Sequence, residues 1–383
     1  MHADLIQHSA TLLRAGERPR AVVFGGGIGM FPPLLERLGR EFEIVANPVL
    51  EEPRLASLWY RLVSLRPSRH ASYRAWRYHM EKTPWAFDLF TREAARALEP
   101  LRGRYDVILF FGAMCAPGRF DGTPMFVFTD SCRWLSSRNR HDEISHFRSA
   151  RDEREWLARE GEVYRHAARV FVGSEFVREA LVTHYGVEPG RAVTTGFGAG
   201  AIFGEPYEKS FDGRSILYIG KGDFEKKGGT LLMKAFERVR RDIPDAQLHV
   251  VGQERLPVAE GVVNHGFVRD KVRLVGLMRQ AHVFALPSLV DRNPISILEA
   301  MAAATPCIAS DYGAMPEIVG DAGLIAPCGD EQALADALLR LLRDPALART
   351  MGARGRVRYE QRFNWDSVWD TTVHEIREAL RVS

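Results

Sequence analysis

Short apolar runs alternate along the chain with longer stretches in which apolar residues recur at helical spacing. The run 20–24 (RAVVF) has the length and β-branched content of a strand, and 32–39 (PPLLERLG) has the pattern of an amphipathic helix. Strands that alternate with helices favour parallel sheets of the α/β class. The further strands predicted in the first half of the chain are 43–46, 105–111, 125–130, 168–173 and 192–196.

The same pattern starts again near residue 215. A strand is predicted at 215–220 and a helix at 228–241, followed by strands at 246–252, 282–287 and 306–310. The stretch 204–214 (GEPYEKSFDGR) is polar and contains Gly and Pro, which is typical of a linker between domains. We therefore predict a first domain at 1–205 and a second at 206–363. The last segment, 364–383, contains an amphipathic helix (364–380) that we expect to cross back to the first domain.

Composition adds limits to this picture. The chain has 383 residues, which suggests two domains rather than one core. With 46% hydrophobic and 26% charged residues it reads as a soluble globular protein, and a net charge of +3 gives no indication of nucleic-acid binding. No apolar run approaches the roughly 18 residues that span a bilayer. The amino-terminal stretch lacks the basic-then-apolar order of a signal peptide, so we expect a cytoplasmic protein.

Ligands bind α/β sheets at the carboxyl ends of the strands, so the loops that follow strands are where a site is expected. The first such loop is 24–31 (FGGGIGMF), whose consecutive glycines, Gly26 and Gly27 among them, let the backbone approach a ligand closely. A dinucleotide-binding G-x-G-x-x-G motif would need glycine where the chain has Met30. A plain tight turn and a dinucleotide site are the alternatives.

The second loop is 219–230 (IGKGDFEKKGGT). Lys221 follows a strand directly, and Lys227 precedes a helix that opens at a pair of glycines. Two ammonium groups beside a helix N-terminus make an anion site suited to a diphosphate. The alternative is a solvated basic loop without a ligand.

The third loop leads into a helix that runs from Ile295 until Pro306 stops it. Asn293 is a good N-cap residue, and Pro294 suits the first helical position. The free N–H groups near 293–296, which include those of Ile295 and Ser296, are expected to bind a diphosphate.

Two acids lie on either side of this helix start. Glu299 can accept hydrogen bonds from a ribose, and Asp291 from a sugar hydroxyl. The alternatives are that Asp291 only compensates the helix dipole and that Glu299 is a surface acid.

The stretch 287–330 (PSLVDRNPISILEAMAAATPCIASDYGAMPEIVGDAGLIAPCGD) resembles the donor domain of retaining glycosyltransferases of family 4. Its matches are Glu299-Ala300-Met301, Thr305-Pro306, Pro316-Glu317 and Gly323-Leu324, and Lys221 with Lys227 matches the family's Arg-x5-Lys diphosphate pair. Gly25–Gly29 is similar to the family's amino-terminal glycine loop. The segment 264–268 (NHGFV), with Phe267 and Val268, resembles the one that lines the nucleobase pocket. The resemblance is dense from about 213 to 363.

The chain also departs from the family pattern. Asp291 replaces the first acid of Glu-x7-Glu, Lys221 replaces Arg, and "RNP" replaces "GFG" after the first acid. The family often has a His after a strand of the amino-terminal domain, where this chain has FTDSCRW, so Asp130 is a candidate for that role. The alternative for Asp130 is a strand-end acid that caps the next turn.

The resemblance implies the GT-B fold, in which two Rossmann-like doubly wound domains face each other across a cleft. It implies a retaining hexosyltransferase that moves a sugar from a UDP- or GDP-sugar to an acceptor hydroxyl, in glycan, glycolipid or cell-envelope polysaccharide biosynthesis. Lys221, Lys227 and the helix amides would stabilise the leaving diphosphate, Asp291 would position the sugar, and Asp130 would face the anomeric centre or the acceptor. No cofactor or metal is expected, and the chain has no Asp-x-Asp.

Other functions stay open. A sugar-nucleotide epimerase of the same fold, a non-catalytic nucleotide-sugar-binding protein and a nicotinamide oxidoreductase are the alternatives.

The acceptor itself is not indicated, and neither is an oligomeric state. The stretch 54–85 of the first domain has a local charge of about +6 and interleaves Trp59, Trp76 and Trp85 with arginines. It suits a peripheral contact with anionic lipid or a lipid-linked acceptor. A groove for an acidic or aromatic small acceptor, and a pair of ordinary amphipathic helices, are the alternatives.

Overall fold

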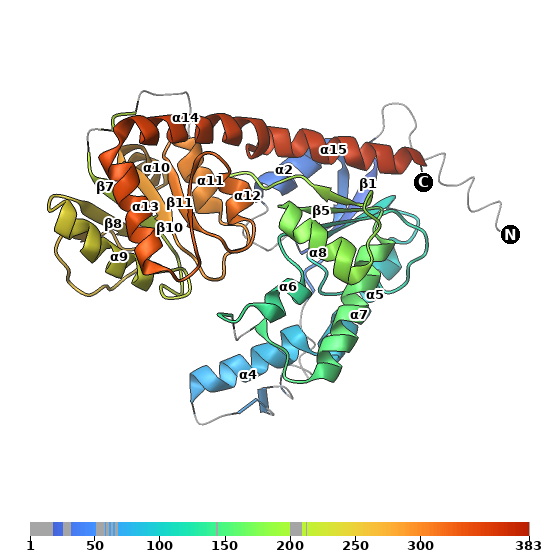
Figure 1. Cartoon of the computed structure of the whole chain (residues 1–383). Coiled ribbons are helices and arrows are strands. Elements are labelled where there is room, and N and C mark those ends of the chain that lie inside the picture. The colour runs from blue at the N-terminus through green and yellow to red at the C-terminus, as the bar shows by residue number, and fades with distance from the viewer. Residues whose placement is uncertain are drawn as a thin grey trace. The chain divides into compact units, whose positions relative to one another are not determined.

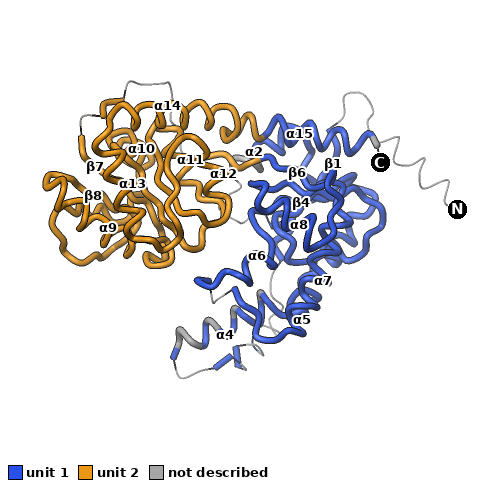
Figure 2. The backbone as a smooth tube through the Cα atoms, viewed as in Figure 1, with its two compact units in different colours: residues 1–195, 369–383 blue, residues 196–368 orange. Residues whose placement is uncertain are grey.

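The computed structural model describes residues 18–25, 32–50, 58, 61–62, 64–65, 68–142, 145–199, 209–211 and 213–382. The chain divides into two compact units (Figure 2). Unit 1 comprises Met1–Thr195 and Trp369–Ser383, and unit 2 comprises Gly196–Val368. The predicted linker at 204–214 follows this division, and its residues 204–208 and 212 lie outside the described residues.

Unit 1 is built on a parallel sheet (Figure 1). Its strand order is β2-β1-β3-β4-β5-β6. Every residue of β3 and β4 is buried, because helices cover both faces of a parallel sheet and its central strands are therefore apolar throughout. The strands are β1 (Arg20–Phe24), β2 (Glu43–Ala46), β3 (Val107–Phe111), β4 (Met125–Thr129), β5 (Arg169–Val172) and β6 (Ala192–Thr194). The helices are α2 (Pro32–Glu41), α4 (Arg69–Lys82), α5 (Pro84–Leu98), the 3-10 turn η1 (Glu99–Leu101), α6 (Arg133–Arg138), α7 (Ala150–His166) and α8 (Glu175–Tyr185).

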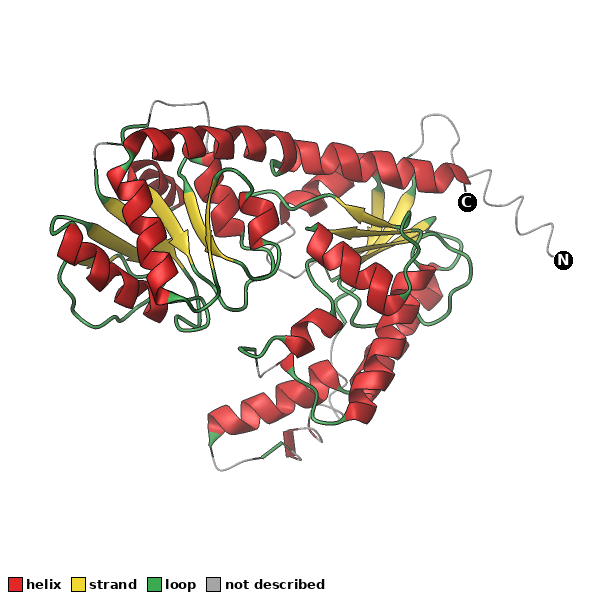
Figure 3. Ribbon diagram, in the orientation of Figure 1, coloured by secondary structure: helices red, strands yellow, loops and turns green. Residues whose placement is uncertain are grey.

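Unit 2 holds a second parallel sheet, with the order β12-β11-β10-β7-β8-β9, and helices flank it (Figure 3). The strands are β7 (Ser215–Ile219), β8 (Gln247–Val251), β9 (Val262–Asn264), β10 (Val283–Leu286), β11 (Cys307–Ser310) and β12 (Gly323–Ala326). The helices are α9 (Gly229–Asp242), α10 (Lys271–Gln280), α11 (Ile295–Ala302), α12 (Met315–Val319), α13 (Glu331–Arg343) and α14 (Pro345–Arg362). The prediction of two parallel α/β sheets is thus confirmed.

The last helix, α15 (Trp365–Val382), begins in unit 2 and continues in unit 1. Within unit 2, a Cβ on Gly198 would lie 2.4 Å from the Trp365 ring, so glycine is needed there. Within unit 1, Glu375 pairs with Arg169 at 2.9 Å and Arg377 with Glu41 at 2.6 Å. In the described part of the chain, no helix is both long and apolar enough to cross a bilayer.

Candidate functional site

The strand order of unit 2 reverses at β7, which lies between β10 on one side and β8 on the other. Sheets of this class bind ligands outside the carboxyl ends of the strands at such a switch point. The loops that leave β7 and β10 are the second and third loops singled out in the sequence. They lie against each other, since the Leu289 amide donates to the Lys226 carbonyl at 2.8 Å.

The close contact of the two loops depends on a glycine. Gly228 has φ +75°, and a Cβ there would lie 2.0 Å from the carbonyl oxygen of Pro287. The buried Ser288 ties the loops further, because its hydroxyl donates to the Lys226 carbonyl at 3.4 Å and accepts from the Asp291 amide at 3.2 Å.

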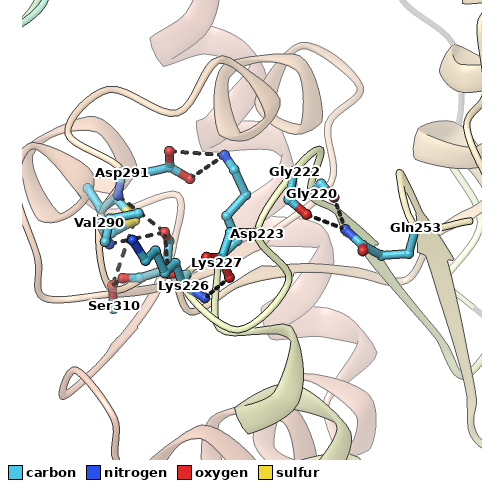
Figure 4. A network of polar contacts seen from close by, with 11 residues as sticks. Gly220, Gly222, Asp223, Lys226, Lys227, Gln253, Val290, Asp291 and Ser310 are labelled. Carbon is cyan, nitrogen blue, oxygen red and sulfur yellow. Dashed lines mark hydrogen bonds and ion pairs between the residues drawn. The ribbon is translucent and has the colours of Figure 1, made fainter. Parts of the chain in front are cut away.

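Lys227 and Asp291 form a two-point ion pair across the loops (Figure 4). The Lys227 Nζ lies 3.0 Å from Oδ1 and 2.9 Å from Oδ2 of Asp291. Both side chains keep access to solvent, with 28% of Lys227 and 20% of Asp291 exposed. In the sequence analysis these residues are assigned to different parts of one ligand, and in the structure they are partners of each other.

The N-cap of α11 differs from the sequence prediction by one residue. The helix begins at Ile295, and Pro294 occupies the cap position with extended backbone (φ −76°, ψ 107°). Asn293 is therefore not the N-cap, and Pro294 is not the first helical residue. Pro294 also has no N–H to offer a ligand. The amides of Ile295 and Ser296 lie in the first turn, where N–H groups have no intrahelical acceptor.

The burial pattern of α11 puts three predicted donor-binding residues on its accessible side. Ile295, Ser296 and Glu299 are partly exposed, whereas Ile297, Leu298 and the residues from Ala300 to Ala302 are buried. The spacing of Ser296 and Glu299 places them on one helix face.

Three buried polar atoms near these loops have no hydrogen-bond partner within the described part of the chain. They are Tyr218 Oη, Arg292 Nη1 and Asn293 Nδ2. Burial raises the pKa of Tyr218, and the negative charges of Asp291 and Asp223 raise it further. Buried polar groups nearly always have a partner, so a ligand or ordered water is expected at the exits of β7 and β10.

Lys221 lies two residues past the end of β7 and is exposed. Its Nζ is 5.4 Å from the centre of the Phe267 ring, which is 48% exposed, and Val268 beside it is partly buried. The Gln253 side-chain amide donates to the carbonyls on either side of Lys221, those of Gly220 and Gly222 (Figure 4). Sequence patterns gave no sign of Gln253, which lies just past the end of β8.

Unit 1 has its own switch point, between β1 and β3. Gly25 leaves β1 with φ +87°, and a Cβ there would lie 2.8 Å from the carbonyl oxygen of Phe111 on β3. The predicted ligand-binding glycines Gly26 and Gly27 lie outside the described residues.

Asp130 is exposed at the carboxyl end of β4. It does not cap the next helix, because the N-cap of α6 is Cys132. Among the described residues no hydrogen bond or ion pair engages its carboxylate.

The first amide of α6 is instead satisfied by an acid that the sequence analysis missed. Arg133 N donates to Glu160 Oε1 at 3.1 Å, and Glu160 is only 5% exposed. Tyr164 and Tyr185 donate to the same carboxylate. Burial raises the pKa of Glu160, and these hydrogen bonds oppose the rise. A glutamate beside Gly161 on the apolar face of α7 was the available signal.

The described residues contain no group of three His, Cys, Asp or Glu side chains suited to hold a metal ion.

Part of the chain is similar in sequence to known glycosyltransferases. Residues 213–344 match the family described as glycosyl transferases group 1. Phosphatidyl-myo-inositol mannosyltransferase of Mycobacterium leprae is 36% identical over 182 residues, which are 45% of this chain and 48% of that protein. MMP alpha-(1->4)-mannosyltransferase of Mycolicibacterium hassiacum is 28% identical over 311 residues, 76% of this chain and 75% of that protein. The chain thus spans about half the length of the first of these relatives.

Among solved structures, sucrose-phosphate synthase from Thermosynechococcus elongatus superposes with a TM-score of 0.66 at 19% identity and covers 96% of this chain and 100% of its own. A UDP-forming trehalose-phosphate synthase from Burkholderia xenovorans gives 0.64 at 14% identity, covering 95% and 99%. The fold is therefore GT-B, the two-domain α/β architecture of nucleotide-sugar glycosyltransferases. Within it, residues 213–344 are the part that matches the family of group 1 glycosyl transferases.

Proposed function

We propose that the chain is a glycosyltransferase that moves a sugar from a nucleotide sugar to an acceptor hydroxyl. The observation that carries this proposal is the placement of Lys227 and Asp291 in contact at the switch point of the group 1 domain. A basic group for the diphosphate and an acid for the sugar then lie in the place where a sheet of this class binds its ligand.

The proposed reaction retains the anomeric configuration and needs no metal. The bond between the anomeric carbon and the diphosphate oxygen breaks while the acceptor oxygen attacks from the same face. The acceptor proton passes to the departing phosphate. Lys221, Lys227 and the first amides of α11 stabilise the charge that builds on that leaving group. Asp291 orients the sugar, and Glu299 accepts from the ribose.

The donor is proposed to be a sugar nucleotide of mannose. Several relatives are named as mannosyltransferases, and one from Corynebacterium glutamicum is named as GDP-mannose-dependent, at 32% identity over 41% of this chain. A UDP-sugar is the alternative, because an Anabaena protein of the same fold was solved with UDP, at 15% identity and a TM-score of 0.64.

The acceptor is proposed to be lipid-linked. Leu58, Leu62 and Leu65 are 58%, 55% and 65% exposed, and Tyr73 on α4 is 54% exposed. Such apolar and aromatic groups beside arginines suit the surface of an anionic bilayer. Of the predicted interfacial tryptophans, Trp59 lies outside the described residues, Trp76 is partly buried and Trp85 is 36% exposed. Sedimentation with vesicles that contain phosphatidylinositol tests this contact, and equal recovery with neutral vesicles would contradict it.

The direct test of the function is nucleotide release with GDP-mannose and UDP-glucose, with and without acceptor. Wild type should turn over in EDTA, whereas Lys227→Ala and Glu299→Ala should each lose at least ~100-fold. Near-normal rates in both variants would refute the site. A strict Mg²⁺ requirement would contradict the metal-free account. Release that never depends on acceptor would favour an epimerase, and binding without turnover would favour a non-catalytic protein.

A further inference from the structure

A lysine at position 221 pays an entropic cost when it binds a diphosphate. Its ammonium is a single point charge on a flexible stem, and ordering such a side chain costs roughly 2 kcal/mol of rotamer entropy. It is also exposed and forms no salt bridge within the described part of the chain. A lysine at this place therefore gains from neighbours that fix its backbone and restrict its side chain before the ligand arrives.

Gln253 fixes the backbone on both sides of Lys221. Its Nε2 donates to the Gly220 carbonyl at 2.6 Å and to the Gly222 carbonyl at 3.3 Å (Figure 4). One amide group has two N–H donors, so both are used and the two carbonyls that flank Lys221 are held by one side chain.

The backbone that carries Gln253 is itself pressed against this loop. Gly252 has φ +100°, and a Cβ there would lie 2.6 Å from the Gly220 oxygen and 3.1 Å from the Lys221 nitrogen. The Gly252 amide also donates to the Gly266 carbonyl at 2.8 Å. The loops that leave β7, β8 and β9 are therefore connected one to the next. Phe267 directly follows Gly266 in the last of these loops.

The side chain of Lys221 lies near Phe267, in the loop that follows β9. Its Nζ lies 5.4 Å from the centre of the Phe267 ring, a distance at which a cation is attracted to the aromatic face. The same ring has Arg269 at 5.9 Å. Phe267 thus attracts the ammonium group of Lys221, while Gln253 holds the backbone on either side of this lysine.

We infer that Gln253 is a positioning residue for Lys221, and that it contributes to nucleotide binding only through that lysine. This inference rests on the proposed function, because it takes a nucleoside diphosphate as the ligand of Lys221. Gln253 does not need to touch the ligand for this role.

A double-mutant cycle tests this role directly. The dissociation constants of GDP and UDP are measured by calorimetry for wild type, Gln253→Ala, Lys221→Ala and the double variant. Gln253→Ala should weaken binding about tenfold, because the hydrogen bonds that hold the backbone of Lys221 are lost. The double variant should bind no more than about twofold more weakly than Lys221→Ala alone, because Gln253 has nothing left to position.

Two further variants keep the result interpretable. Gln253→Glu preserves the size of the side chain but sets carboxylate oxygens against two carbonyl oxygens, so it should weaken binding at least as much as the alanine. Gln247→Ala changes the same residue type at the opposite end of β8, where it is exposed, and should leave binding unchanged.

The outcomes separate the two ideas. Additive losses in the cycle, or an unchanged affinity in Gln253→Ala, would overturn the positioning role and leave the proposed function standing. If wild type binds neither diphosphate, both the proposed function and this inference are wrong.

Discussion

At the scale of single residues, the central feature is the ion pair in which Lys227 and Asp291 neutralise each other. A partly exposed ion pair is worth only about 0–1 kcal/mol, so a diphosphate with several charges can displace it. The pair keeps the lysine oriented and its charge compensated. We propose that donor binding transfers Lys227 to the phosphates and frees Asp291 for a sugar hydroxyl.

Asp291→Asn should bind free GDP or UDP more tightly and turn over more slowly. The variant releases Lys227 from its competitor, and a pair of this strength converts to about two- to fivefold in affinity. Turnover should fall ~10-fold or more, since the sugar loses an orienting carboxylate. Calorimetry and a nucleotide-release assay measure the two effects. Asp245→Asn, which disturbs an exposed pair with Arg214 in the same unit, is the control. Weaker diphosphate binding in Asp291→Asn would contradict the account.

A second residue-scale feature is the buried Lys209, which is 8% exposed. Its Nζ donates to the carbonyls of Met278 and Arg279 at 3.0 and 2.9 Å and to Thr305 Oγ1 at 2.7 Å. Burial lowers the pKa of Lys209 to about 7. When Lys209 becomes charged, at and below about pH 7, the folded state is therefore less stable relative to the unfolded state.

The pH dependence of stability should reveal this lysine. Between pH 7 and about 10 the unfolded chain keeps this proton while the folded chain releases it, so stability rises with pH. The free energy of unfolding, compared with that of Lys209→Met, should shift in favour of wild type by up to about 1.4 kcal/mol per pH unit. Urea unfolding at several pH values measures the difference. A difference that stays constant or reverses over this range would show that Lys209 remains charged in the fold.

At the scale of elements, the site depends on how closely the exits of β7 and β10 approach. Gly228 permits that approach for two reasons: it adopts a positive φ, and it has no Cβ. This close contact fixes the two loops against each other, which suits the binding of a charged ligand between defined groups.

Gly228→Ala should separate the loops. The new Cβ would meet a backbone oxygen at 2.0 Å, so the loop must move. We expect a loss of stability of about 2 kcal/mol or more and at least ~10-fold weaker diphosphate binding. Gly213→Ala is the matched control, because nothing lies within 4 Å of a Cβ there. Urea unfolding and calorimetry measure both effects, and the contact is unimportant if the two variants behave alike.

Helices and strands could be predicted from the sequence where the spacing of apolar residues alone determines them. The predicted strands 20–24 and 43–46 coincide with β1 and β2, and the helix predicted at 364–380 is observed as Trp365–Val382. The predicted N-cap of α11 was wrong by one residue, because residue preferences do not tell whether Pro294 lies at the cap or inside the helix.

The site was predictable only in part. Lys221, Lys227, Asp291 and Glu299 could be named because they lie in the loops that follow two strands, or on the helix after such a loop, and resemble motifs of a known family. The contact between Lys227 and Asp291 could not, since it joins loops 64 residues apart. Gln253 and Glu160 act through single side chains that point at distant backbone groups. Nothing in their local sequence marks such a partner.

At the scale of the whole molecule, the candidate chemistry is divided between the two units. The cations, the paired acid and the helix start all lie in unit 2, within the residues 213–344 that match the group 1 glycosyl transferases. Asp130, the glycine loop after β1 and the exposed apolar residues near α4 belong to unit 1. Donor recognition is therefore proposed for the second unit, and acceptor recognition for the first.

The most direct test is a crystal structure of the chain with GDP or UDP. We predict the diphosphate at the exits of β7 and β10, with its oxygens bonded to Lys227, Lys221 and the amides of Ile295 and Ser296. The pair between Lys227 and Asp291 should be broken there. A diphosphate bound elsewhere, with that pair intact, would contradict the account.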